Sequence, residues 1–299
     1  MWGGVDIKIE MTLDEFEQAL AQIGYITEKK DRIALTVYLA IRLEKPILVV
    51  GPPGVGKTEV AKALSRVMSA PLIRLQCYEG LDENKALYEW NYQRQLLRIQ
   101  MQKENLQEED LFSPEYLLPR PLLQGLMSRE ASVLLIDEID KTDSEFEAFL
   151  LEILGEFQVT IPEMGTIKAL ERPLVVLTSN GERELSDGLK RRCVFLNVEA
   201  PSVEKEVRIL RSKLPGLPDK LAYQVAKAVG ILREKLVLQK TPSVSETLDW
   251  AKALLVMGKS ELDPAWIEAT LNLLLKSQED LELFYQEMGA ERLLWETKV

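Results

Sequence analysis

One stretch of the sequence has the residue types and spacing that cradle phosphate groups. Its glycines let backbone N–H groups turn inward around phosphates, and a helix that starts there favours negative charge. Lys57 would reach the β- and γ-phosphates of a nucleotide, and the Thr58 hydroxyl would bind Mg²⁺. The stretch matches the P-loop pattern GxxxxGK[ST] and reads Gly51-Pro52-Pro53-Gly54-Val55-Gly56-Lys57-Thr58. We therefore expect a binding site for ATP and Mg²⁺.

Two adjacent carboxylates, Asp137 and Glu138, follow the apolar run Val133 to Ile136. Alternation along a strand points them in different directions at its carboxyl end, where open α/β sheets bind ligands. Asp137 would hold Mg²⁺ through water, and Glu138 would orient and deprotonate the attacking water. The alternative is a pair of solvated turn acids. The P-loop upstream favours the catalytic interpretation.

A third polar cluster, Thr178-Ser179-Asn180, follows the apolar run Leu174 to Leu177. Asn180 could hydrogen-bond the attacking water or the γ-phosphate. An asparagine at a strand end is also a common turn residue. Its position, as the next strand-end polar group after Glu138, favours the functional role.

The chain has no histidine. A Ser-His-Asp triad, a histidine-ligated metal and an imidazole base are therefore excluded within it. Its two cysteines, Cys77 and Cys193, are too few for a zinc finger or a disulfide framework. We expect both to be buried small hydrophobic residues in a reducing compartment.

Charge and hydropathy limit the partners. Lys and Arg total 37 against 48 Asp and Glu, a net charge of -11 that repels phosphate backbones, so nucleic acid is not favoured. Apolar runs such as Pro46 to Val50 are far shorter than the roughly 20 residues that span a bilayer. Asp6 and Glu10 stand where a signal peptide would be basic or apolar. We expect a cytoplasmic protein without a membrane span.

The elements that must position these residues are short apolar runs separated by stretches of helical length. Such runs are typical of parallel strands that are apolar on both faces, and their alternation with helices predicts an α/β doubly wound sheet. The five runs are Ile47 to Val50, Leu72 to Leu75, Val133 to Ile136, Leu174 to Leu177 and Val194 to Leu196.

Helices are expected before and between these strands. Thr12 and Glu15 form a capping-box pattern before a helix that stops at Gly24, and a second helix is expected from Thr27 to Leu43. A Thr142/Glu145 capping box and Gly155 bound another helix, Thr142 to Leu154.

Two segments depart from simple alternation. Glu156 to Ile161 and Thr166 to Leu170 flank a Pro-Glu-Met-Gly turn, which predicts an inserted β-hairpin. Glu79 to Gln124 is too long for one strand–helix unit, and its acidic stretch, Glu104 to Asp110, is most simply a solvated face or loop.

After Ala200 and Pro201 the strand signals cease. We therefore expect a nucleotide-binding core over residues 1–198 and a helical domain over 199–299. Caps at Ser243, with Glu246, and at Asp263 support two of its helices. The expected helices are Val203 to Leu214, Asp219 to Leu238, Val244 to Met257 and Pro264 to Lys276.

The set of motifs, with Leu189-Lys190-Arg191-Arg192 before the fifth strand, resembles an AAA+ ATPase over nearly the whole chain. The hairpin and the extra segment resemble the MoxR-type branch. Three further stretches resemble its CoxD-like subgroup: Leu75 to Asp82, Tyr88 to Tyr92 and Glu246 to Ala251.

The resemblance implies a P-loop AAA+ core with a helical lid, assembled as a hexameric ring with each site at a subunit interface. By position, Arg191 or Arg192 would complete the neighbour's site, or pair with surface acids instead. The family's sensor arginine is missing, because the corresponding region reads Lys240-Thr241-Pro242-Ser243-Val244-Ser245-Glu246. Lys240 lacks the bidentate fork of arginine.

A cluster in the long segment, Glu79 to Gln124, has three possible interpretations. Its aromatic and basic side chains could stack on nucleic acid, pack a helical insert, or, by resemblance only, face the ring's pore and grip a client. Packing is favoured. The cluster comprises Tyr88, Trp90, Tyr92, Arg94 and Arg98.

As a whole, the resemblance implies Mg²⁺-dependent ATP hydrolysis by a ring that remodels or matures a client protein. The CoxD-like subgroup implies a carbon monoxide dehydrogenase type of client and a von Willebrand A-domain partner. Two other functions stay open: a DNA-associated AAA+ motor or loader, and a nucleotide-gated scaffold with little turnover, which the missing arginine favours.

Overall fold

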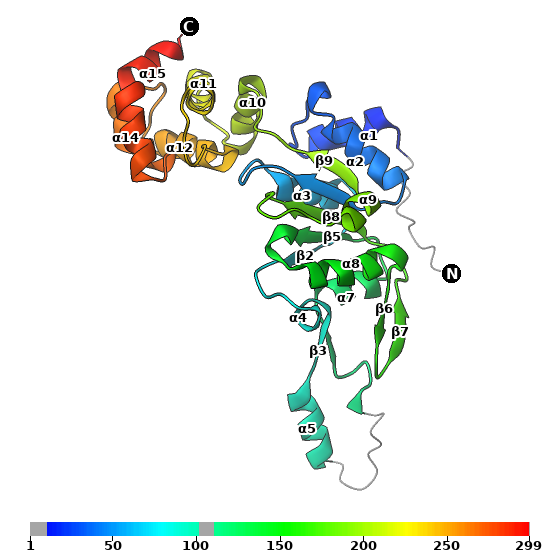
Figure 1. The fold of residues 1–299 in the computed structure, drawn as a ribbon. Helices are drawn as coiled ribbons and strands as arrows, with labels where there is room; N and C mark the ends of the chain where they lie inside the picture. Colours follow the sequence, from blue (N-terminus) through cyan, green and yellow to red (C-terminus); the bar gives the residue numbers. More distant parts are fainter. Residues whose placement is uncertain (1–10, 102–110, 299) are drawn as a thin grey trace. The chain divides into compact units, whose positions relative to one another are not determined.

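The computed structural model describes residues 11–101 and 111–298, so the acidic stretch Glu104 to Asp110 lies outside the described residues. The chain forms two compact units (Figure 1). The first comprises the chain up to Ile23, Arg32–Gly51 and Lys57–Asn197. The second comprises Gly24–Asp31, Pro52–Gly56 and the chain from Val198 onward.

The first unit is built on a five-stranded parallel sheet in the order β2-β5-β8-β1-β9, which confirms the predicted α/β fold. The central strands β5 and β8 are buried at every residue. The edge strands β2 and β9 expose alternate residues, so the expectation of two apolar faces is wrong for them. The strands are β1 (Ile47–Val50), β2 (Leu72–Gln76), β5 (Val133–Asp137), β8 (Leu174–Ser179) and β9 (Val194–Asn197).

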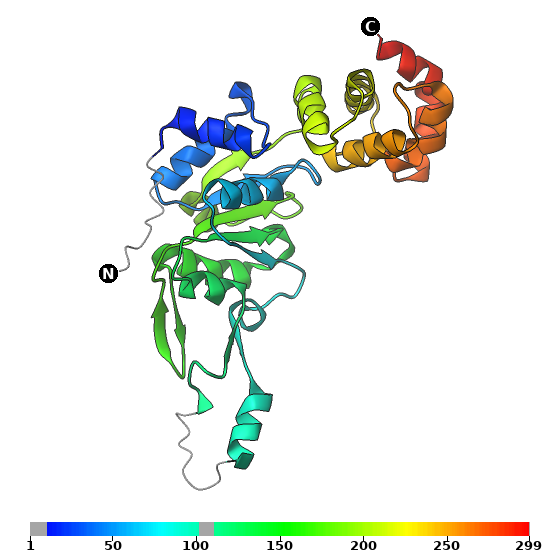
Figure 2. The same cartoon turned by 180° about the vertical axis from the view of Figure 1, so that it is seen from behind.

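Helices cover both faces of this sheet (Figure 2). The capping box of Thr12 and Glu15 is confirmed at the start of α1. On one face lie α1 (Leu13–Gln22), α2 (Ile33–Arg42) and α3 (Lys57–Val67), and on the other lie α7 (Pro121–Met127) and α8 (Ser144–Glu156).

Three expected helix boundaries are wrong. The helix expected from Thr27 is interrupted at Arg32, whose left-handed backbone (φ 51°) separates a 3₁₀ turn from α2. Asp143 rather than Thr142 caps α8, by accepting a 2.8 Å hydrogen bond from Phe146 N–H. The helix passes through Gly155 and ends at Glu156, and the residue that caps it, Phe157, is left-handed.

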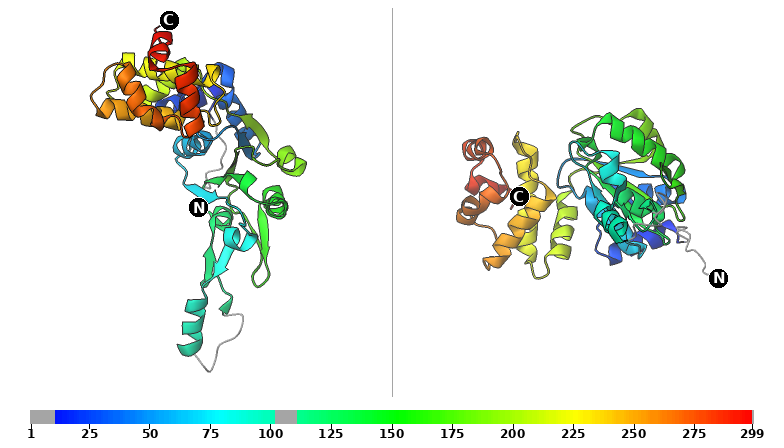
Figure 3. Two further views of the ribbon diagram at one scale, coloured as in Figure 1. Left: turned by 60° about the vertical axis from the view of Figure 1, so that its left-hand side comes forward. Right: turned by 90° about the horizontal axis from the view of Figure 1, so that it is seen from below.

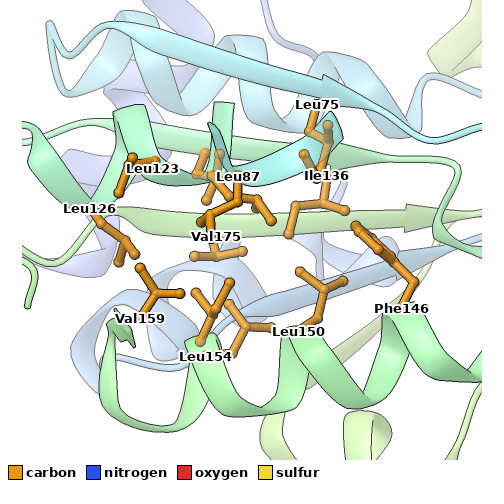
Figure 4. Close-up of a cluster of buried hydrophobic side chains, with 14 of the residues drawn as sticks. Leu75, Leu87, Leu123, Leu126, Ile136, Phe146, Leu150, Leu154, Val159 and Val175 are labelled. Atoms are coloured by element: carbon orange, nitrogen blue, oxygen red, sulfur yellow. The ribbon is translucent and has the colours of Figure 1, made fainter. Parts of the chain in front are cut away.

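The hydrophobic core between α8 and the sheet supports the ends of the central strands. Phe146, Leu150 and Leu154 of α8 face Ile136 of β5 and Val175 of β8 (Figure 4). All five side chains are buried. The packing therefore fixes the strand from which Asp137 and Glu138 emerge.

The predicted inserted hairpin is confirmed as β6 (Gln158–Ile161) and β7 (Gly165–Lys168), which pair antiparallel. In the long segment, Trp90 is buried against Tyr88 and Phe112, so packing rather than base stacking accounts for it. This segment contains α4 (Glu83–Leu87), β3 (Tyr88–Trp90), α5 (Tyr92–Met101) and β4 (Leu117–Pro119), with β3 and β4 antiparallel.

The second unit is helical (Figure 3). Its core surrounds the fully buried Trp250 and Phe284. The predicted caps at Ser243 and Asp263 are confirmed, but the helix that begins at Pro264 ends at Thr270 in a 3₁₀ turn. The sequence patterns did not predict its last two helices, α14 and α15. The helices of the unit are α10 (Val203–Lys213), α11 (Asp219–Lys235), α12 (Val244–Val256), α13 (Pro264–Thr270), α14 (Gln278–Glu287) and α15 (Ala290–Glu296).

Over the described residues, none of the helices is both long enough and apolar enough to cross a bilayer.

A buried ion pair ties three parts of the helical unit together. Glu206 of α10 is fully buried and receives two hydrogen bonds, of 2.7 and 2.9 Å, from Arg233 of α11. Arg233 also donates a 2.7 Å bond to the carbonyl of Pro242, just before α12. The pair therefore fixes the segment that precedes this helix.

We predict that Glu206→Gln destabilises the protein by about 3–5 kcal/mol, because it leaves the Arg233 charge buried without its partner. The measurement is urea unfolding followed by far-UV circular dichroism. The control is Glu261→Gln, which breaks the exposed pair with Lys220 and is expected to leave the unfolding curve almost unchanged. Equal unfolding midpoints for the two variants would contradict the prediction.

Candidate active site

The P-loop joins β1 to α3, and its backbone has the conformation that its glycines allow. Gly54 and Gly56 have φ angles of 73° and 99°, a region that side chains with a Cβ rarely enter. Lys57, the first residue of α3, is only 6% exposed, and its Nζ donates a 2.8 Å hydrogen bond to Gly51 O. Burial lowers the pKa of Lys57, while the negative charges of Asp140, Glu138 and Asp137 oppose that shift.

Asp137 is the last residue of β5 and is 3% exposed. Thr58 Oγ1 lies 3.1 Å from its Oδ1, and Thr178 Oγ1 donates a 2.6 Å hydrogen bond to the same oxygen. Arg74 Nη2 lies 2.6 Å from Oδ2. The structure thus brings the predicted magnesium residues Thr58 and Asp137 together.

Glu138 has a left-handed backbone, with φ 60° and ψ 51°. For a residue other than glycine this conformation costs about 1–2 kcal/mol, and such strain clusters at functional sites. Its N–H donates a 2.9 Å hydrogen bond to Thr178 Oγ1, and its Oε2 accepts a 3.1 Å bond from Gln76 Nε2.

Asn180 lies directly after β8, at the edge of the sheet that carries the P-loop. Ser179, before it, pairs with Val50, and its carbonyl accepts a 3.3 Å bond from Gly51 N–H. The buried Asp140 accepts 3.0 Å bonds from the N–H groups of Asn180 and Glu182. The backbone of Asn180 is therefore held in place by a carboxylate from the turn after β5.

Arg191 and Arg192 end α9 (Asp187–Arg192), and both are exposed. Among residues 11–101 and 111–298, neither forms an ion pair, so the alternative of pairing with surface acids finds no support there. The start of α9 is anchored, because Glu147 of α8 accepts a 2.9 Å bond from the N–H of its cap residue Ser186.

Four residues of this constellation were not singled out from the sequence: Arg74, Gln76, Asp140 and Thr178. Arg74 and Gln76 left a signal, as polar residues at alternate positions of an otherwise apolar strand. Asp140 is the third acid of the stretch that begins at Asp137. Thr178 belongs to the polar cluster that ends in Asn180, and only Asn180 was assigned a role from the sequence.

The donors fit Mg²⁺ that arrives with a nucleotide. In the part of the chain that the structure describes, no cluster of three or more Cys, Asp or Glu side chains could hold a metal by itself. Mg²⁺ commonly takes one or two carboxylates and completes its shell with phosphates and water. The hard oxygens of Thr58 and Asp137 suit that arrangement.

Both cysteines are free and buried, as predicted. Burial is the largest cause that raises the pKa of Cys77 and of Cys193 to about 12. Neither thiol is therefore an ionised nucleophile at neutral pH.

Hydrogen bonds hold the segment before α12, which contains Lys240. Asp280 accepts hydrogen bonds from the N–H groups of Gln239 and Lys240, at 2.8 and 3.2 Å, and the Lys240 side chain is exposed. Arg233 contacts this segment, but its guanidinium is bound to Glu206.

Comparisons with known proteins identify a domain family and similar chains. The family described as AAA domain (dynein-related subfamily) matches residues 46–193. "Uncharacterized protein SAUSA300_1302" of Staphylococcus aureus (strain USA300) is 30% identical over 223 residues, 71% of this chain and 76% of that protein. "Uncharacterized protein SAB1265c" of strain bovine RF122 / ET3-1 is 28% identical over 221 residues, again 71% and 76%.

Among solved structures, a mutant of Thermotoga maritima RuvB has a TM-score of 0.51 at 17% identity, over 83% of this chain and 70% of that one. This likeness concerns the fold, which is of the AAA+ type. The chain belongs to the same family as the S. aureus protein SAUSA300_1302 and carries an AAA domain of the dynein-related type.

Proposed function

We propose that this protein hydrolyses ATP with the help of Mg²⁺. The observation that carries the proposal is the convergence of Lys57, Thr58, Asp137 and Glu138 at one edge of the sheet. A buried cation, a hydroxyl and two acids are the groups that phosphoryl transfer to water needs.

Each residue has a role in this proposal. The P-loop N–H groups and Lys57 bind the phosphates, and Thr58 and Asp137 hold the metal. Bound Mg²⁺ would neutralise phosphate charge. Glu138 orients the attacking water and accepts its proton, and Asn180 hydrogen-bonds the water or the γ-phosphate.

We predict that Glu138→Gln lowers ATP turnover by roughly 10² to 10⁴ and leaves ATP binding intact, because only the proton acceptor is removed. Steady-state phosphate release and titration with a fluorescent ATP analogue measure the two quantities. The matched control is Glu145→Gln, an exposed acid in the first turn of α8 that is expected to keep wild-type turnover. Near-normal hydrolysis by Glu138→Gln would remove the residue from this role.

We also propose a ring, with six subunits as the expected number, in which residues 199–299 act as the lid. Arg191 or Arg192 of one subunit would stabilise the transferred phosphate of the next. Their exposure at the end of an anchored helix, without ion pairs among the described residues, supports a role between subunits.

We predict that one of Arg191→Ala and Arg192→Ala lowers turnover by about 10³ to 10⁵, the value of an arginine supplied by a neighbour. Mixing that variant with Lys57→Ala should restore part of the ATPase activity, since intact P-loops then meet intact arginines. Mixing Lys57→Ala with Glu138→Gln is the control and should restore none, because both defects lie on the same side of the interface. Failure of both arginine variants to complement would refute the assignment.

The client is proposed from the MoxR-type and CoxD-like resemblance alone. We infer that the ring remodels or matures a metalloenzyme of the carbon monoxide dehydrogenase type, together with a von Willebrand A-domain partner. Glu138→Gln in ATP should retain such a client during purification, because hydrolysis would no longer release it. Mass spectrometry of the retained proteins, with Lys57→Ala as the non-binding control, measures the enrichment. An identical protein set on both variants would contradict a client bound in the ATP state.

Neither alternative function is preferred. The net charge of -11 opposes a DNA-associated motor, and the likeness to RuvB extends to the fold only. A nucleotide-gated scaffold draws support from the lysine in place of the sensor arginine. Turnover that is abolished by Glu138→Gln would separate an ATPase from a scaffold.

A further inference from the structure

The charge of Asp137 is balanced by an arginine from the edge strand. Arg74 of β2 donates to Asp137 Oδ2 from Nη2 at 2.6 Å and from Nε at 3.1 Å. Thr58 and Thr178 approach Oδ1 at 3.1 and 2.6 Å. A carboxylate offers about four lone-pair sites, so donors of the chain itself fill this one.

The same strand also binds the second acid. Gln76 follows Arg74 by two residues, which places both side chains on one face of β2. Gln76 Nε2 donates a 3.1 Å bond to Glu138 Oε2, and Arg74 Nη2 donates to Gln76 Oε1. Arg74 and Gln76 thus form a connected pair that holds Asp137 and Glu138.

Arg74 lies on an edge strand, where its side chain can move away from Asp137. Within the sheet β2 pairs only with β5, and the Arg74 side chain is 51% exposed. A divalent cation on Asp137 would lie within a few ångströms of the guanidinium and repel it. Mg²⁺ and the Arg74 guanidinium would both bind the Asp137 carboxylate, and the exposed Arg74 side chain can turn toward solvent.

We propose that Arg74 competes with Mg²⁺ for Asp137. The inference rests on the proposed function, in which Asp137 holds the metal of Mg²⁺–ATP. Arg74 is then a positioning residue: it sets the Mg²⁺ concentration at which the Asp137 carboxylate becomes free to bind the metal.

The test measures the Mg²⁺ requirement of nucleotide binding apart from turnover. A fluorescent ATP analogue is held at fixed concentration while Mg²⁺ is titrated. Loss of a charge-assisted fork should lower the half-saturating Mg²⁺ of Arg74→Gln by about tenfold. Binding of the analogue in EDTA should equal that of the wild type. Mn²⁺ electron paramagnetic resonance in the presence of ADP should show the same tightening for the metal itself.

Two further variants serve as a charge-conserving comparison and as a control. Arg74→Lys keeps the charge but not the fork, so it should require an intermediate Mg²⁺ concentration, and it carries the test if Arg74→Gln folds poorly. Arg94→Gln is the matched control: its side chain is 54% exposed and pairs with Glu115 at 2.6 Å, away from both catalytic acids. It should titrate like the wild type.

An unchanged Mg²⁺ requirement in Arg74→Gln would overturn the proposal. So would weaker binding of the analogue in EDTA, which would mean that Arg74 contacts phosphate instead. Wild-type protein that binds no nucleotide, or binds it without regard to Mg²⁺, would instead refute the proposed function itself.

Discussion

The need to satisfy the buried carboxylate of Asp137 organises the first unit. An ionised acid that is removed from water is costly unless hydrogen bonds and opposite charge surround it. Here the donors come from three separate elements: β2, α3 and β8. Each of these elements must therefore keep its position relative to β5, and the parallel register and the core beneath α8 hold them there.

Thr178 extends this constraint from one acid to the next. Its hydroxyl donates to Asp137 and accepts from the backbone of Glu138, so a single side chain fixes both the carboxylate and the turn that follows. The left-handed conformation of Glu138 is tolerated because this bond and the buried Ile139 hold the turn on both sides. In this turn, the strained backbone belongs to the residue whose carboxylate is proposed to meet the attacking water.

The strands and the P-loop were predicted well, because apolar runs bounded by turn residues and a glycine-rich motif have few alternative structures. Prediction failed where neighbouring residues compete for one role. Thr142 and Asp143 are both good helix caps, and only the tertiary position of the turn after β5 assigns the cap to Asp143. Arg74 and Gln76 were not predicted as site residues, because their contacts depend on the pairing of β2 with β5. Local sequence patterns carry no information about that pairing.

The loop after β8 is bound at both of its ends. Asp140 holds its first residues, and Glu147 holds Ser186 and Arg183 near its end. Both ends of residues 180–186 are therefore bound to buried carboxylates. Through these bonds the turn after β5 is connected to the start of α9, the helix that ends in Arg191 and Arg192.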